Sequence, residues 1–177
     1  MHIPDGFIDI PTSTAFAALA ATGVALSIKG AKSTLDEKTA PLAGLTATFI
    51  FAVQMLNFPV AAGTSGHLLG GALAAVLVGP YAATLSLTVV LLMQGLLFAD
   101  GGLTAIGLNV FNMAIIGVWA GYGAFLLLQK ILPSSKFSTT LSAGLAGLLS
   151  VPAAAAGFVL QYAIGANATF SVTAVLT

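Results

Sequence analysis

The two histidines of this chain are its strongest candidates for metal binding or proton transfer. The sequence has 177 residues, no cysteine and only two histidines, His2 and His67. His2 directly follows the first methionine, in the opening stretch MHIPDGF. The lack of cysteine excludes disulfides, thiolate nucleophiles and cysteine-based metal sites together. A metal site in this chain would therefore use imidazole, main-chain or oxygen donors.

An unblocked Met1-His2 start can chelate a metal ion through nitrogen atoms alone. The donors are the amine of Met1, the deprotonated backbone nitrogen of His2 and the His2 imidazole. They close a five-membered and a six-membered chelate ring, so they lie near one plane. The imidazole of His67 would complete a square, which Ni(II) and Cu(II) prefer, whereas zinc prefers a tetrahedron. Binding releases protons, so we expect it to fail at low pH.

The stretch Pro4-Asp5-Gly6 favours a turn, because proline fixes φ and glycine tolerates a positive φ. We expect this turn to fold Met1 and His2 back toward the rest of the chain. An imidazole that binds a metal also needs a hydrogen-bond acceptor for its second nitrogen. The candidate groups around the site are Asp5, Ser65, Gln94, Asp100 and Asn109.

The composition is that of an integral membrane protein. Hydrophobic residues make up 58% of the chain and charged residues 6%, and the mean hydropathy is +1.06. A soluble domain is normally about a quarter charged. Five basic and five acidic residues balance, so nucleic acid is not an expected partner. The first 14 residues hold no Lys or Arg, so we expect no cleaved signal peptide.

Six apolar segments approach the length of about 20 residues that a transmembrane helix needs. The predicted fold class is an all-α polytopic membrane helix bundle with about six transmembrane helices, in the cell membrane. We expect one transmembrane domain over residues 1–177, with residues 1–12 as an extracytoplasmic metal-binding segment. The third segment is short enough to be a half-helix or re-entrant piece. The segments cover residues 13–28, 41–58, 66–78, 81–98, 106–128 and 141–164.

Five lysines orient this bundle. Short lysine-rich loops stay in the cytoplasm, and four predicted crossings separate the two lysine clusters. Because four is even, both clusters can be cytoplasmic if the third segment is a true crossing. The amino terminus and both histidines then lie outside. The clusters are Lys29, Lys32 and Lys38 after the first segment, and Lys130 and Lys136 after the fifth.

Amide side chains concentrate near the predicted outer ends of the helices. Polar groups are costly in lipid and usually face the interior of a bundle, so we expect a polar chamber near the outer surface. The alternative is that each amide bonds a neighbouring helix, for about 1 kcal/mol apiece. These residues are Gln54, Asn57, Gln94, Asn109, Asn112 and Gln161.

An enzymatic function is the less favoured alternative. Ser65 and His67 could be a nucleophile and its base, but no third group is evident to orient the histidine. The only glutamate, Glu37, falls in a predicted cytoplasmic loop. We therefore expect no catalytic residues, and a membrane hydrolase is much less favoured than metal binding.

Three motifs in this order resemble the CbiM/NikM family, the substrate-capture membrane subunits of energy-coupling-factor transporters for cobalt and nickel. They are MHIPDGF at residues 1–7, GTSGHLLGG at residues 63–71 and QGLLFADGGLTAIGLNVFNMA at residues 94–114. The resemblance implies the same square of nitrogen atoms, from Met1, His2 and His67. It also implies uptake of Ni²⁺ or Co²⁺ as a transported ligand, with no cofactor.

The resemblance implies three partners in the membrane and cytoplasm. They are a membrane coupling subunit, a cytoplasmic ATPase and often a small accessory membrane subunit. The chain has no Gly-x-x-x-x-Gly-Lys-Ser/Thr motif, so the ATPase would be another chain. Family members usually continue through a further apolar helix. Capture of a vitamin or other organic substrate stays an alternative, and nickel and cobalt both stay open because both accept nitrogen ligands.

Overall fold

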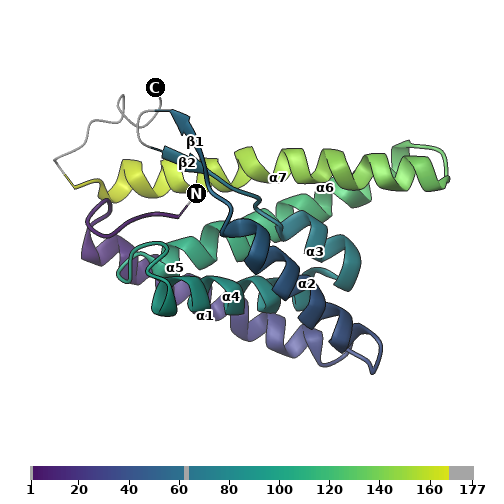
Figure 1. Cartoon of the computed structure of the whole chain (residues 1–177), viewed down its shortest axis with the longest axis horizontal. Coiled ribbons are helices and arrows are strands. Elements are labelled where there is room, and N and C mark those ends of the chain that lie inside the picture. The colour runs from purple at the N-terminus through teal and green to yellow at the C-terminus, as the bar shows by residue number, and fades with distance from the viewer. Residues whose placement is uncertain (1, 62–63, 168–177) are drawn as a thin grey trace.

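The structure is a computed structural model that describes residues 2–61 and 64–167 as a bundle of helices with one small β-hairpin (Figure 1). The predicted all-α membrane bundle is confirmed. In chain order the elements are α1 (Ile10–Ala31), α2 (Thr39–Gln54), β1 (Phe58–Ala61), β2 (Thr64–Gly66), α3 (Gly71–Val78), α4 (Pro80–Leu97), α5 (Ile106–Asn109), the π-helix η1 (Val110–Gly117), α6 (Val118–Ile131) and α7 (Lys136–Gly165).

Four helical segments of the described chain are long and apolar enough to cross a membrane. They are α1, α4, the continuous segment Ile106–Ile131 and α7, while α2 is a shorter apolar helix. The predicted third span is only the eight-residue α3. At 1.5 Å per residue such a helix is about 12 Å long, far short of a hydrocarbon core of about 30 Å. The third predicted segment is therefore a half-helix, one of the two forms expected for it, and the helical part does not span the membrane by itself.

Close glycine contacts define the two ends of the bundle. Gly30, near the end of α1, lies against the ring of Tyr81 at the start of α4. Gly107 and Gly165 lie against Ala17 and Thr12, in the first half of α1. Residues 66–79 thus lead the chain back to the end of the bundle where α1 finishes. Figure 1 shows the two lysine-bearing loops, α1–α2 and α6–α7, at that same end, as the even number of crossings requires.

Helix α1 begins at Ile10, three residues earlier than predicted. The Asp9 carboxylate accepts a hydrogen bond of 2.8 Å from the backbone N–H of Thr12, and a proline lies in the first turn. Both features favour a helix start, because the first turn of a helix has no internal partners for its N–H groups. In the described chain, residues 2–9 precede this helix.

Buried residues form two clusters, and the smaller one holds the N-terminal segment. The main cluster fills the space between the helices and includes Ile50, Leu87 and Met113. The second joins Ile3 and Ile8 to Ala105 and Leu108. Residues before α1 are therefore packed against the start of the α5–η1–α6 segment. Many leucines are exposed on the outer helix faces, among them Leu45 and Leu148, which is the pattern of a surface that meets lipid.

The orientation of the bundle can be tested with single cysteines. We expect a cysteine at Leu103, in the exposed loop after α4, to react with an impermeant thiol reagent on intact cells. A cysteine at Ser33, in the lysine-bearing loop, should react only after the membrane is opened. Because the native sequence has no cysteine, the native protein is the control for background labelling. Labelling of position 33 but not of position 103 on intact cells would contradict the predicted orientation and indicate the opposite one.

Candidate metal site

The two imidazoles, far apart in the sequence, are neighbours in the structure. The ring centroids of His2 and His67 lie 4.8 Å apart with an interplanar angle of 22°. The His2 side chain is 6% exposed, and His67 is half-buried. The turn predicted between His2 and α1 is present, with Gly6 at φ +83°. The structure thus brings together the two histidines that the sequence singles out.

Asn109 holds the N-terminal segment through the backbone of Ile3. The N–H of Ile3 donates to Asn109 Oδ1 at 2.8 Å, and Asn109 Nδ2 donates to the Ile3 carbonyl at 3.3 Å. The same carbonyl also accepts from the Gly102 N–H at 2.9 Å. The backbone N–H and carbonyl of an extended segment need hydrogen-bond partners, which a neighbouring strand usually supplies. Here the side-chain amide of Asn109 supplies them. The residue directly after His2 is thereby fixed in register.

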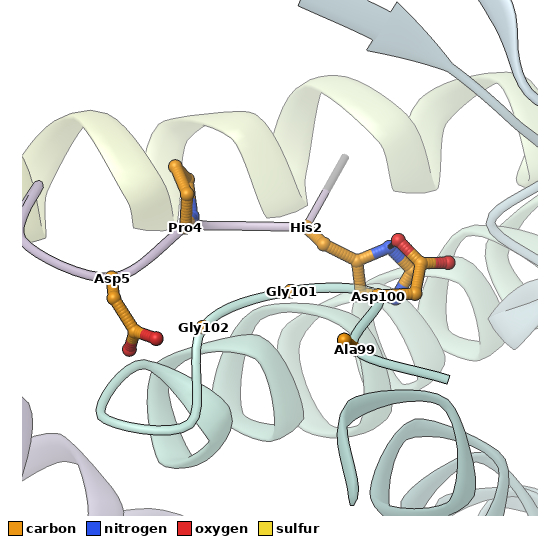
Figure 2. A pocket seen from close by; sticks show the side chains of 7 residues that line it. All are labelled: His2, Pro4, Asp5, Ala99, Asp100, Gly101 and Gly102. Carbon is orange, nitrogen blue, oxygen red and sulfur yellow. Dashed lines mark ion pairs between the residues drawn. The ribbon is translucent and has the colours of Figure 1, made fainter. Parts of the chain in front are cut away.

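Two glycines let the N-terminal segment lie against the α4–α5 loop, as Figure 2 shows. A Cβ on Gly102 would collide with the backbone nitrogen of Asp5 and stand 2.7 Å from the carbonyl carbon of Pro4. Gly101 has φ +97°, which favours glycine, and a Cβ there would stand 3.1 Å from the His2 Cβ. The sequence signal for this contact is the Asp-Gly-Gly stretch at residues 100–102.

Asp5 anchors the turn instead of serving an imidazole. Its Oδ1 accepts hydrogen bonds from the backbone N–H and the hydroxyl of Thr104. These bonds lower the pKa of Asp5 below its usual value. In Figure 2 its carboxylate points toward the α4–α5 loop and not toward His2. Of the candidate acceptors, Asp5 therefore holds the loop, and Asn109 likewise holds the backbone.

Asp100 is the carboxylate beside His2. Its Oδ1 lies 3.3 Å from His2 Nδ1, and its own N–H donates to the Gln94 carbonyl at 3.0 Å. Burial lowers the pKa of His2 to about 4, although the Asp100 charge acts in the opposite direction. The ring is therefore neutral near pH 7, with the Asp100 carboxylate beside its Nδ1. A neutral imidazole is the form that binds metals.

The backbone around His67 fixes both its place and its proton. Its Nδ1 lies 2.9 Å from the Leu68 carbonyl, which can only accept, so Nδ1 carries the proton and Nε2 the lone pair. Gln54 Nε2 donates to the Leu69 carbonyl at 2.8 Å, two residues further on. Burial lowers the pKa of His67 as well. This arrangement presents a neutral imidazole with a basic Nε2.

A pocket of about 310 Å³ lies beside His2. The amides predicted to line a chamber do not line it. Asn112 and Gln161 instead form a reciprocal buried pair, with bonds of 2.7 and 2.9 Å between η1 and α7, so the helix-bonding alternative holds for them. Asn57 is exposed. The pocket is lined by His2, Pro4, Asp5, Ala99, Asp100, Gly101 and Gly102 (Figure 2).

The remaining candidate residues divide into those that the structure places and those that it does not. Gln94 is fully buried in α4. Ser65 lies in β2, where it pairs with Pro59, but its side chain lies outside the described part, as does Met1 as a whole. Among residues 2–61 and 64–167, no group of three His, Asp or Glu side chains could hold a metal ion.

The fold and this site define a polytopic membrane protein with two adjacent imidazoles, one buried and one half-buried, at one end of its bundle. The chain belongs to the CbiM family, described as the cobalt uptake substrate-specific transmembrane region, which matches residues 2–177. The predicted membership is confirmed.

Relatives and solved structures agree with that assignment. A putative fused nickel transport protein, NikMN, from Archaeoglobus fulgidus is 43% identical over 155 residues, which are 88% of this chain and 50% of the relative. The cobalt transport protein CbiM of Sorangium cellulosum is 36% identical and covers 100% of this chain and 78% of its own. A crystal structure of a truncated transition metal transporter superposes with a TM-score of 0.85 at 32% identity, covering 98% and 79% of the two chains.

The chain spans about half the length of several curated relatives that it matches, from 40% to 60% in the first three.

Replacing Gly102 should weaken metal binding by displacing the N-terminal segment. We expect Gly102→Ala to bind Ni(II) at least about tenfold more weakly, or 1.4 kcal/mol, because its Cβ would push Asp5 and Pro4 away. Calorimetric titration of purified protein measures this change. Gly147→Ala is the matched control, since a Cβ at Gly147 in α7 meets nothing within 4 Å. Equal affinity of both variants would mean that close approach at Gly102 is not needed.

Proposed function

We propose that this chain captures Ni²⁺ or Co²⁺ at the extracytoplasmic side of the cell membrane. It would act as the substrate-binding membrane component of a metal uptake system. The observation that carries the proposal is the stacked pair of neutral imidazoles, His2 and His67. One of them belongs to a segment whose backbone is fixed by Asn109 one residue later. The metal is the transported substrate, and we assign no catalytic role to the chain.

Main-chain nitrogen explains why one histidine stands at the second position. A His at this position offers its own backbone nitrogen and its Nδ1 to the same ion, and the preceding amine closes a second ring. His67 would give its Nε2, the nitrogen that keeps the lone pair. Planar nitrogen ligation favours Ni(II) over zinc. The His67 geometry and the fixed Ile3 backbone both support this donor set.

The surroundings favour a small cation over an organic substrate. The only tryptophan, Trp119, packs edge to face against Tyr81 with ring centroids 5.1 Å apart. Tyr81 lies at the end of the bundle where α1 finishes, away from His2. The pocket beside His2 is instead lined by small residues and two carboxylates, which suit a cation better than an apolar organic molecule.

The partners are part of the proposal. The two named relatives are a fused nickel transport protein and a cobalt transport protein, which supports a role within a larger uptake system. We propose a membrane coupling subunit, a cytoplasmic ATPase and a small accessory membrane subunit as its partners. The sequence holds no phosphate-binding Gly-x-x-x-x-Gly-Lys-Ser/Thr motif, so ATP hydrolysis would be supplied in trans.

Adding one residue before Met1 tests the donor set. An inserted alanine moves the terminal amine out of chelate distance and leaves every side chain in place. We expect Ni(II) affinity to fall by at least about a hundredfold, or 2.8 kcal/mol, because a donor and a fused chelate ring are lost together. Calorimetric titration of the native and extended proteins measures the difference.

A tag added only at the C-terminus is the control for this experiment and should leave the affinity unchanged. If the alanine-extended protein binds Ni(II) as tightly as the native one, the terminal amine is not a ligand. His2 and His67 would then bind through side chains alone, with other donors.

A further inference from the structure

Gln94 is a buried amide that the described structure leaves without hydrogen bonds. It lies one turn before the end of α4, its side chain is 0% exposed, and neither Oε1 nor Nε2 has a partner among the described residues. Leaving a buried polar group unsatisfied costs about 1–3 kcal/mol. A buried amide without a partner among the described residues calls for an explanation.

The residues around Gln94 are those of the candidate metal site. Its backbone carbonyl accepts from the Asp100 N–H at 3.0 Å, and Asp100 in turn contacts His2 Nδ1 at 3.3 Å. The second nitrogen of that ring, Nε2, is buried and also has no partner in the described part of the chain. The Gln94 side chain is close enough to His2 to favour its protonated form, which raises the pKa of His2 against the larger effect of burial.

Chelation at the second residue decides which ring nitrogen must hold the proton. The six-membered chelate ring closes only through Nδ1, because the path from backbone nitrogen through Cα, Cβ and Cγ reaches Nδ1 first. A neutral imidazole that gives Nδ1 to a metal carries its proton on Nε2. Asp100 can then no longer accept from Nδ1. A buried Nε2–H needs an acceptor, and two residues near the ring carry a buried oxygen without a partner, Gln94 Oε1 and Asp100 Oδ2. Because Asp100 lies on the Nδ1 side of the ring, Gln94 is the acceptor left for Nε2.

We propose that Gln94 is a positioning residue that accepts a hydrogen bond from Nε2–H of metal-bound His2. Metal loading thus gives Nδ1 to the ion, and Nε2–H donates to Gln94. This inference rests on the proposed function. The ring stays neutral throughout: Nδ1 releases its proton to solvent, and Nε2 takes one up.

The two neighbours then have different roles in the loaded site. With the backbone nitrogen of His2 deprotonated, a divalent ion leaves one net positive charge, which the freed Asp100 carboxylate balances. Gln94 supplies an acceptor without a second negative charge, since a carboxylate in this fully buried position would be costly unless paired. A glutamine therefore suits the chemistry better than a glutamate.

Nuclear magnetic resonance of the two histidines tests the proposal directly. The chain has only two histidines, so ¹⁵N-histidine labelling gives two imidazole spin systems, and square-planar Ni(II) is diamagnetic. We expect the His2 proton on Nδ1 in the unloaded protein. In the Ni(II)-loaded protein we expect it on Nε2, hydrogen-bonded and slow to exchange with water.

The variant Gln94→Met removes the acceptor while keeping side-chain length and helix propensity. We expect its Nε2 proton to exchange at least about tenfold faster and its Ni(II) affinity to fall by about 10–100-fold, the usual effect of losing a group that orients a metal ligand. Gln161→Met is the matched control. Gln161 is equally buried but bonds Asn112, so this variant should lose stability without changing the His2 proton or the affinity.

The outcomes separate the two proposals. Ni(II) binding with the His2 proton on Nδ1, or an Nε2 proton unaffected by Gln94→Met, would overturn the role of Gln94 and leave metal capture intact. If the native protein does not bind Ni(II) at all, the proposed function fails, and this inference fails with it. Should Gln94→Met not fold, the proton position in the native protein still decides, because it needs no variant.

Discussion

The pair of hydrogen bonds between Asn109 and the Ile3 backbone is the constraint on which the candidate site depends. A chain terminus is normally among the most mobile parts of a protein, and a chelate built from the first two residues requires the opposite. Asn109 binds both the N–H and the carbonyl of Ile3, and Ile3 itself is buried. The position of His2 relative to His67 follows from this fixed residue.

The bundle in turn fixes Asn109. It ends α5, directly before the π-helix η1, and π-helical turns often occur at functional sites. One turn later, Asn112 pairs with Gln161 and ties the same segment to α7. The far end of α7 also holds the N-terminal segment, because Gly165 accepts from the Asp9 N–H at 2.8 Å and Asn167 donates to the Gly6 carbonyl at 2.7 Å. Residues 2–9 are thus held from two helices at once.

The sequence predicts the broad fold because the fold depends on composition. It predicts that the two imidazoles lie together because the lysines indicate which side of the membrane each loop is on. Hydrophobic runs show where helices cross, and lysines alone place His2 and His67 on one face. The sequence does not predict that α3 has eight residues or that the adjoining segment forms a hairpin, since both depend on how neighbouring helices pack. Nor does it separate the roles of Asp5 and Asp100. Which carboxylate meets Thr104 and which meets His2 is decided by the close approach at Gly101 and Gly102.

The central claim is that main-chain and imidazole nitrogens surround the captured metal in one plane. X-ray absorption at the nickel edge of the purified, Ni(II)-loaded protein measures the coordination directly. The account predicts a four-coordinate, planar Ni(II) with nitrogen donors only, two of them imidazoles. A six-coordinate ion with mostly oxygen donors, or a tetrahedral one, would contradict it, because neither geometry can be built from a chelate at the first two residues completed by His67.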